Sequence, residues 1–215
     1  MSQRPIAVLF DLDGTLVDTI QFILSSVRHT FDGYGARCPS DAEWIAGIGT
    51  PLRAQLADFA LGPGDVEPLL ERYRAHQRLH FERLTRAYAG AVEVVRGLAA
   101  RGHPIAVVTA KLHEPAERAV KLVGIADCLR SIVSADSCPR SKPHPDPVLL
   151  ALRVLGREPG EAVFVGDGAN DELPGAERVG MTTIQLRPPG EQLTESGQAW
   201  RGTSVEHLAQ VLEFV

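Results

Sequence analysis

Two aspartates stand two residues apart directly after a short apolar run near the start of the chain. Asp11 and Asp13 follow residues 6–10 in the stretch IAVLFDLDGT. A continuous apolar run of this length is typical of a buried strand, and ligand sites in open parallel sheets form where strands end. Two carboxylates at such a place are costly unless a cation neutralises them. The pair therefore indicates a cation site, and carboxylates at such a place are chemically able to attack an electrophile and to transfer protons.

Polar residues at three later points of the chain suit the chemistry of a phosphate ester. Thr109 ends the apolar run 105–108 and offers a hydroxyl to phosphoryl oxygens. Lys142 is one of three lysines among 22 basic residues, and a lysine offers phosphate a compact point charge. Asp167 and Asp171 follow another apolar run, and hard carboxylate oxygens suit Mg²⁺. These residues predict a Mg²⁺ site that handles phosphate.

Parallel strands would bring these positions together. Short apolar runs alternate with helix-period segments through most of the chain, as expected of a parallel sheet covered by helices. The expected strands are residues 6–10, 105–108, 131–133, 162–165 and 182–186. Helices that each end at a glycine are expected at residues 91–100, 114–123, 147–155 and 171–179. We also expect a final helix at 205–214, with Thr203 or Ser204 as its N-cap, and a surface loop at 187–202.

The alternation of strands and helices breaks once, between residues 17 and 87. This part of the sequence predicts no strand, and its helices are expected at residues 19–31, 41–46, 52–60 and 66–84. An all-helical insertion thus interrupts an α/β domain after its first strand. We therefore expect one domain made of residues 1–16 and 88–215, and a helical domain made of residues 17–87.

Composition and charge exclude several classes of partner. The net charge of -5 comes from interspersed acidic and basic residues, so we expect no binding of nucleic acid. No apolar run approaches the roughly 18 residues that a membrane span requires, and we expect no membrane partner. Cys38, Cys128 and Cys138 form no CxxC pair and are expected to be free thiols. These features predict a cytoplasmic protein that acts on a small molecule.

Four motifs, in order along the chain, resemble those of the haloacid dehalogenase superfamily. PIAVLFDLDGTLVDT is similar to motif one, VTAK at residues 108–111 to motif two, KPHP at 142–145 to motif three and GDGAND at 166–171 to motif four. The resemblance covers essentially the whole chain. It implies a Rossmann-like parallel α/β core, with the helical insertion as an α-helical-bundle cap domain.

The resemblance also implies a role for each motif residue. Asp11 would accept the phosphoryl group as an aspartyl-phosphate, and Asp13 would act as general acid and base. Mg²⁺ would be held by Asp11, the backbone carbonyl of Asp13 and Asp167, with Asp171 bound directly or through water. The residues expected to contact phosphate are Gly14, Thr15, Thr109, Ala110 and Lys142.

Some positions near the motifs leave alternatives open. Ala110 departs from the Asn or Gly that is usual there, so only its backbone is expected to contribute. Lys111 could be a cation at the rim of the site or a surface residue. Glu172 is expected to be a solvated residue of the first helical turn. Arg53, in GIGTPLR, could bind an anionic leaving group such as a carboxylate, or could be an exposed residue of an interhelical turn.

The size and position of the insertion resemble the phosphoglycolate phosphatase-like subfamily. This implies a Mg²⁺-dependent phosphatase of small phosphate monoesters, acting as a monomer or homodimer, with phosphoglycolate as the first candidate substrate. A β-phosphoglucomutase-like phosphotransferase, a pyrophosphatase or nucleotidase, and a non-catalytic protein of the same fold stay open as alternatives. The complete charged set argues against the last of these, and a cap without lysine argues against phosphonoacetaldehyde hydrolase, which needs a cap lysine.

Overall fold

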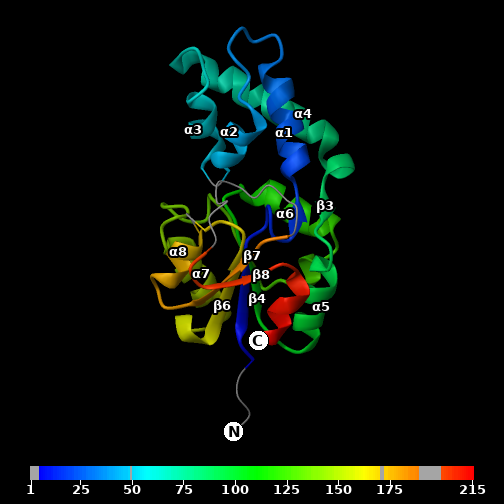
Figure 1. The fold of residues 1–215 in the computed structure, drawn as a ribbon, viewed down its shortest axis with the longest axis vertical. Coiled ribbons are helices and arrows are strands. Elements are labelled where there is room, and N and C mark those ends of the chain that lie inside the picture. Colours follow the sequence, from blue (N-terminus) through cyan, green and yellow to red (C-terminus); the bar gives the residue numbers. More distant parts are fainter. Residues whose placement is uncertain (1–4, 49, 170–171, 189–199) are drawn as a thin grey trace.

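Six parallel strands form the centre of the molecule (Figure 1). The computed structural model describes residues 5–48, 50–169, 172–188 and 200–215. The strand order is β5-β4-β1-β6-β7-β8, and every neighbouring pair runs parallel. The strands are β1 Ala7–Phe10, β4 Ile105–Val108, β5 Ser131–Val133, β6 Ala162–Gly166, β7 Thr182–Leu186 and β8 Thr203–Val205. The parallel α/β fold expected from the sequence is therefore confirmed.

Helices cover both faces of this sheet, which explains why its central strands are continuously apolar. Side chains of β1 alternate between the faces, so Val8 and Phe10 enter one apolar cluster and Ala7 and Leu9 enter another. The first cluster includes residues of α5 and α6, and the second includes residues of α7 and α8. These helices are α5 Ala91–Ala100, α6 His113–Leu122, α7 Asp146–Leu155 and α8 Glu172–Glu177. Both faces of β1 are thus shielded from water, and its four residues are fully buried.

The C-terminal edge of the sheet differs from the expectation. The expected helix at 205–214 is wrong, because Thr203–Val205 is the strand β8, paired with β7, and a 3₁₀ helix, Leu208–Glu213, follows it. The expected surface loop at 187–202 is wrong at its end. Trp200 is 9% exposed, and its Nε1 donates to Thr183 Oγ1 at 3.0 Å. Residues 189–199 lie outside the described part of the chain.

Four helices form a separate layer above the carboxyl edge of the sheet (Figure 1). They pack around a third apolar cluster with an aromatic centre that includes Phe31, Trp44 and Tyr73. The helices are α1 Ile20–Phe31, α2 Asp41–Ala46, α3 Leu52–Ala57 and α4 Val66–Leu84. The side chain of Ser40 caps α2 in a capping box with Glu43. Helix α3 ends at Ala57, three residues earlier than expected.

The chain enters and leaves this helical layer through two adjacent short strands. Strands β2 (Val17–Asp18) and β3 (Arg86–Ala87) pair antiparallel, with Val17 opposite Ala87. The expectation of no strand between residues 17 and 87 is therefore wrong at both ends of that segment. Beside the pair, Phe22 of α1 and Phe81 of α4 meet edge to face with centroids 5.8 Å apart. Both rings belong to the same apolar cluster as Phe10, which joins the base of the helical layer to the sheet.

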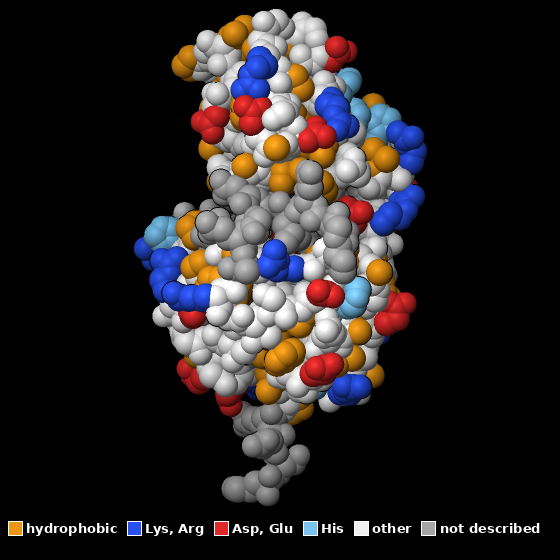
Figure 2. All heavy atoms as spheres, viewed as in Figure 1, with side chains coloured by type: hydrophobic (Ala, Val, Ile, Leu, Met, Phe, Trp, Pro, Cys, Tyr) orange, Lys and Arg blue, Asp and Glu red, His pale blue; other side chains and the backbone are white. Residues whose placement is uncertain are grey.

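The described surface agrees with the charge pattern of the sequence. Figure 2 shows acidic and basic side chains interspersed over the visible face. Cys38, Cys128 and Cys138 are free thiols, as expected. Within the described ranges, none of the helices combines the length and the apolar character needed to cross a bilayer.

Candidate active site

The carboxylates of Asp11 and Asp167 meet at the carboxyl edge of the sheet. Strands β1 and β6 are paired neighbours, and Asp11 and Asp167 are the residues that follow Phe10 and Gly166 at their ends. The backbone N–H of Asp11 donates to Val165 O at 2.9 Å, which fixes the two strand ends side by side. Both aspartates are buried, at 5% and 4% exposure.

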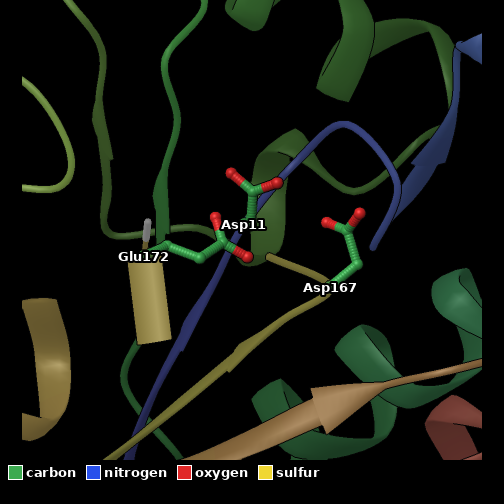
Figure 3. Close-up of side chains that lie close together, drawn as sticks. All are labelled: Asp11, Asp167 and Glu172. Carbon is green, nitrogen blue, oxygen red and sulfur yellow. The ribbon is translucent and has the colours of Figure 1, made fainter. Parts of the chain in front are cut away.

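A third carboxylate, from Glu172 at the start of α8, joins this pair. Figure 3 shows the three side chains converging from β1, β6 and α8. One oxygen from each of them lies within 4.8 Å of the others. Hard oxygen donors held this closely match the preference of Mg²⁺, and the like charges favour binding of a divalent cation. Asp171, the fourth expected ligand, lies outside the described residues.

Lys142 lies between two of these carboxylates. Its Nζ is 2.6 Å from Asp11 Oδ1, 2.5 Å from Glu172 Oε2 and 3.4 Å from Val108 O, and its side chain is 4% exposed. The structure therefore places Lys142 beside Asp11, in agreement with the motif. Burial raises the pKa of the Asp11 carboxyl, and the Lys142 ammonium opposes that rise.

Glu172 is the residue whose sequence-based expectation is wrong. It is expected to be solvated, yet it is 3% exposed, and its Oε1 accepts the Gly168 N–H at 3.1 Å. A Cβ on Gly166 would lie 1.9 Å from that oxygen, so only glycine leaves room for the carboxylate. Helical spacing is the sequence signal that indicates the burial of Glu172, because this residue lies four positions before the buried Ala176 on one face of α8.

Asp13 is held by two partners at the rim of the site. Lys111 Nζ lies 2.7 Å from Asp13 Oδ2 and 2.9 Å from Oδ1, and the two side chains are 14% and 15% exposed. The Thr19 hydroxyl also donates to Asp13 Oδ1. Of the two alternatives for Lys111, the structure supports a cation at the site.

The remaining motif residues either lie against Asp167 or line the cavity. Gly14 adopts φ +82°, and a Cβ there would lie 2.6 Å from Asp167 Oδ2, so glycine is required on both counts. Thr15 Oγ1 lies 3.4 Å from Asp167 Oδ1. Thr109 and Ala110 line the cavity above the carboxylates, and Thr109 Oγ1 accepts the Lys111 N–H at 3.1 Å. The predicted contacts of these four residues with phosphate stay a prediction.

A cavity of about 760 Å³ lies between the strand ends and the helical layer. Its volume suits a small-molecule ligand. The sheet side carries the four carboxylates of Asp11, Asp13, Asp167 and Glu172. The expected specificity residue Arg53 also lines it, but its guanidinium pairs with Glu67 and its side chain is 62% exposed. Three arginines that the sequence patterns do not single out line the same cavity: Arg74, Arg78 and Arg118.

Comparisons with known proteins agree with this geometry. The sequence profile of the haloacid dehalogenase-like hydrolases matches residues 8–186. The chain is 37% identical over 176 residues to pyrophosphatase PpaX of Halalkalibacterium halodurans, covering 82% of this chain and 80% of that protein. It is 32% identical to the PpaX of Anoxybacillus flavithermus, covering 94% and 87% of the two chains. Among solved structures, a predicted phosphoglycolate phosphatase from Haemophilus somnus superposes with a TM-score of 0.85 at 21% identity, covering 99% and 98% of the two chains.

Proposed function

The chain belongs to the haloacid dehalogenase-like hydrolase family, and on this basis we propose that it is a Mg²⁺-dependent phosphatase that uses Asp11 as its nucleophile. The observation that carries the proposal is the convergence of Asp11 and Asp167, which follow adjoining strands, with Lys142 from the segment before α7. An aspartate beside a buried ammonium and a set of hard oxygen donors is equipped to attack a phosphorus atom and to neutralise the charge around it.

The proposed reaction has two steps. Asp11 attacks phosphorus through a carboxylate oxygen, the bond from phosphorus to the ester oxygen breaks, and Asp13 in its protonated form gives a proton to the leaving oxygen. Water then attacks the aspartyl-phosphate, Asp13 takes a proton from that water, and inorganic phosphate leaves with the Asp11 carboxylate restored. Lys142 neutralises charge next to Asp11 in both steps. Lys111 and Thr19 hold the Asp13 carboxylate at the rim of the cavity.

The proposed metal ligands are Asp11, Asp167 and the backbone carbonyl of Asp13, with Asp171 direct or through water. When bound, Mg²⁺ would neutralise phosphoryl oxygens and lower the repulsion between them and the nucleophile. The buried carboxylate oxygens fit this role, since Asp11, Asp167 and Glu172 offer oxygen atoms within 4.8 Å of one another.

Two substrates have specific support. Pyrophosphate is favoured by the relatives named pyrophosphatase, which share 37% and 32% of aligned residues with this chain. Phosphoglycolate is the second candidate, and it follows from the motif resemblance and from the helical layer above the site.

We propose that residues 17–87 form the cap of residues 1–16 and 88–215. A cavity of about 760 Å³ under such a cap admits a small phosphorylated molecule.

Hydrolysis of p-nitrophenyl phosphate with and without Mg²⁺ tests the proposal. The wild-type chain should turn over this ester only with the metal, and Asp11→Asn should lose at least about 1,000-fold in kcat because the neutral amide cannot form the acyl phosphate. Asp58→Asn, an exposed aspartate at the end of α3, is the control and should behave as wild type. Absence of metal-dependent turnover in the wild type would favour a non-catalytic binding protein. Transfer of phosphate to a second hydroxyl compound, with little release to water, would favour the phosphotransferase.

A further inference from the structure

One face of helix α4 looks into the cavity. The lining residues of this helix recur at the spacing of a single helical stripe, and they are Leu70, Tyr73, Arg74, Gln77, Arg78 and Phe81. The ends of the stripe are apolar and buried, and both arginines lie in its middle. A helix face that only packs against a neighbour would be apolar along its length. The polar middle of this stripe therefore indicates contact with a ligand.

Charged side chains of both signs line the sheet side of the cavity, where the carboxylates of Asp11, Asp13 and Asp167 lie beside Lys111 and Lys142, and where α6 adds Glu114 and Arg118. The charged residues that α4 contributes to the lining are both arginines. At the strand ends, Lys142 and the metal would contact the oxygens of the reacting phosphate. A substrate whose only anionic group is that phosphate would place no charge near α4. The arginines on the opposite wall therefore match a second negative charge on the same ligand.

The helical stripe and the strand ends line the same cavity of about 760 Å³, so one small molecule can contact both. A short metabolite with charged groups at both ends suits such a cavity.

Arg74 and Arg78 are both available to a ligand. Within the part of the chain that the structure describes, Arg74 forms no ion pair, and Arg78 pairs with Glu71 at 2.6 Å between side chains 60% and 67% exposed. Solvent screens a pair of this kind, so a ligand can replace it. Arg118 instead stacks on Phe81, 4.4 Å from its centroid, and pairs with Glu82 at 3.4 Å. Arg53 pairs with Glu67 between side chains that are each 62% exposed, so its pair is as replaceable as that of Arg78, but Arg53 lies on α3 and not in the α4 stripe.

From these observations we propose that Arg74 and Arg78 form a second anion-binding subsite, which selects phosphate esters or anhydrides that carry a further phosphate or carboxylate group. The proposal rests on the proposed phosphatase function and deepens it by naming the class of substrate. It assigns the selection to α4.

The test compares substrates with and without a second anionic group. kcat/KM is measured for pyrophosphate, phosphoglycolate and p-nitrophenyl phosphate with the wild type, Arg74→Gln, Arg78→Gln and the control Arg83→Gln. Arg83 is an exposed arginine of the same helix that does not line the cavity. We expect the wild type to prefer at least one doubly anionic substrate, and each cavity variant to lose about 10-fold or more on it, mainly through KM. All variants should stay within about 2-fold of wild type on p-nitrophenyl phosphate.

Each other outcome has a distinct meaning. Equal losses on all three substrates, unchanged kcat/KM on the doubly anionic ones, or no wild-type preference for them would overturn the subsite. Arg74→Lys and Arg78→Lys should restore part of the lost kcat/KM, because an ammonium keeps the charge but not the fork of donors. If the wild type turns over no p-nitrophenyl phosphate with Mg²⁺, the proposed function itself fails, and the subsite falls with it.

Discussion

Glu172 shows how one buried side chain organises its neighbours at this site. One of its oxygens accepts from Lys142 at 2.5 Å, and the other accepts the Gly168 N–H at 3.1 Å. Lys142 in turn reaches Asp11 at 2.6 Å. Glu172 therefore connects the ammonium beside Asp11, the proposed nucleophile, to the loop that carries Asp167. We infer a positioning role for Glu172.

Glu172→Gln tests this positioning role. The amide keeps the size of the side chain but loses the charge that holds Lys142, so we expect kcat to fall about 10-fold or more with KM for the ester little changed. Steady-state kinetics with p-nitrophenyl phosphate at saturating Mg²⁺ provides the measurement. Glu177→Gln, at the far end of α8 with a side chain 39% exposed, is the matched control and should stay at wild-type kcat. A Glu172→Gln enzyme with wild-type kcat would contradict the assigned role.

Residue types, their spacing and the motif resemblance together predict that Asp11, Asp167 and Lys142 lie close to one another, and they do. Asp11 and Asp167 meet because the ends of the neighbouring parallel strands β1 and β6 lie at one sheet edge. The position of Lys142, in the segment between β5 and α7, follows only from the motif resemblance. The burial of Glu172 escapes prediction because acidic residues at helix starts are usually solvated, and only tertiary contact with Lys142 shows otherwise. The position of Arg74 at the cavity could not be predicted, because no local sequence pattern shows that a helix of the insertion faces the strand ends.

At the level of secondary-structure elements, the contact between α1 and α4 contains a cluster of imidazoles. His76 of α4 stacks on His29 of α1 with centroids 4.8 Å apart, and it contacts His80 of α4 with rings tilted by 51° and centroids 4.4 Å apart. The Ser26 hydroxyl lies 3.2 Å from His76 Nδ1. Partial burial and the nearby positive charges of His80, His29 and Arg83 lower the pKa of His76 below its ordinary value of 6.5.

This lowered pKa predicts that acid weakens the helical layer. Between the folded-state pKa of His76 and 6.5, the unfolded chain binds more protons than the folded chain, so stability falls as the pH decreases through that range and is fully present above it. His76→Gln should reduce the loss of melting temperature between pH 7.5 and 5.5, measured by calorimetry. His144→Gln, in an exposed loop, should leave that loss unchanged. An identical pH dependence in His76→Gln and wild type would refute the prediction.

Sequence patterns predict the longer strands of the sheet but not the shortest ones. Strands β4 and β7 match their predicted bounds, because β4 is a run of four apolar residues and β7, with the sequence TTIQL, is rich in the β-branched residues that favour strands. Strands β2 and β3 have two residues each, too few for any periodicity. Strand β8 is a three-residue edge strand with Thr203 and Ser204, which suit a helix N-cap equally well. These short strands are specified by pairing with distant partners.

For the molecule as a whole, the main consequence of the fold is a concentration of negative charge at the sheet edge. Folding brings Asp11, Asp167 and Glu172 together in a buried site, with oxygen atoms within 4.8 Å of one another. Like charges at this separation oppose the folded state. From one break in the alternation of strands and helices, the sequence predicts a helical domain at residues 17–87 and an α/β domain made of the rest of the chain. Whether residues 17–87 act as a separate cap stays a prediction.

The charge at the sheet edge predicts that Mg²⁺ stabilises the entire fold. A cation that binds only the folded chain adds about 2.7 kcal/mol at a concentration 100 times its Kd, which for a chain of this size raises the melting temperature by about 5 to 10 °C. Chelation with EDTA should remove that gain.

Asp167→Asn should abolish the Mg²⁺ response and at the same time raise the stability of the metal-free chain, because it removes one of the repelling charges. Asp127→Asn, at an exposed position remote from the site, should keep the wild-type response. A metal-free Asp167→Asn protein less stable than the wild type would show that the carboxylate supports the fold even without a cation. Retention of the full Mg²⁺ response would exclude Asp167 as a ligand.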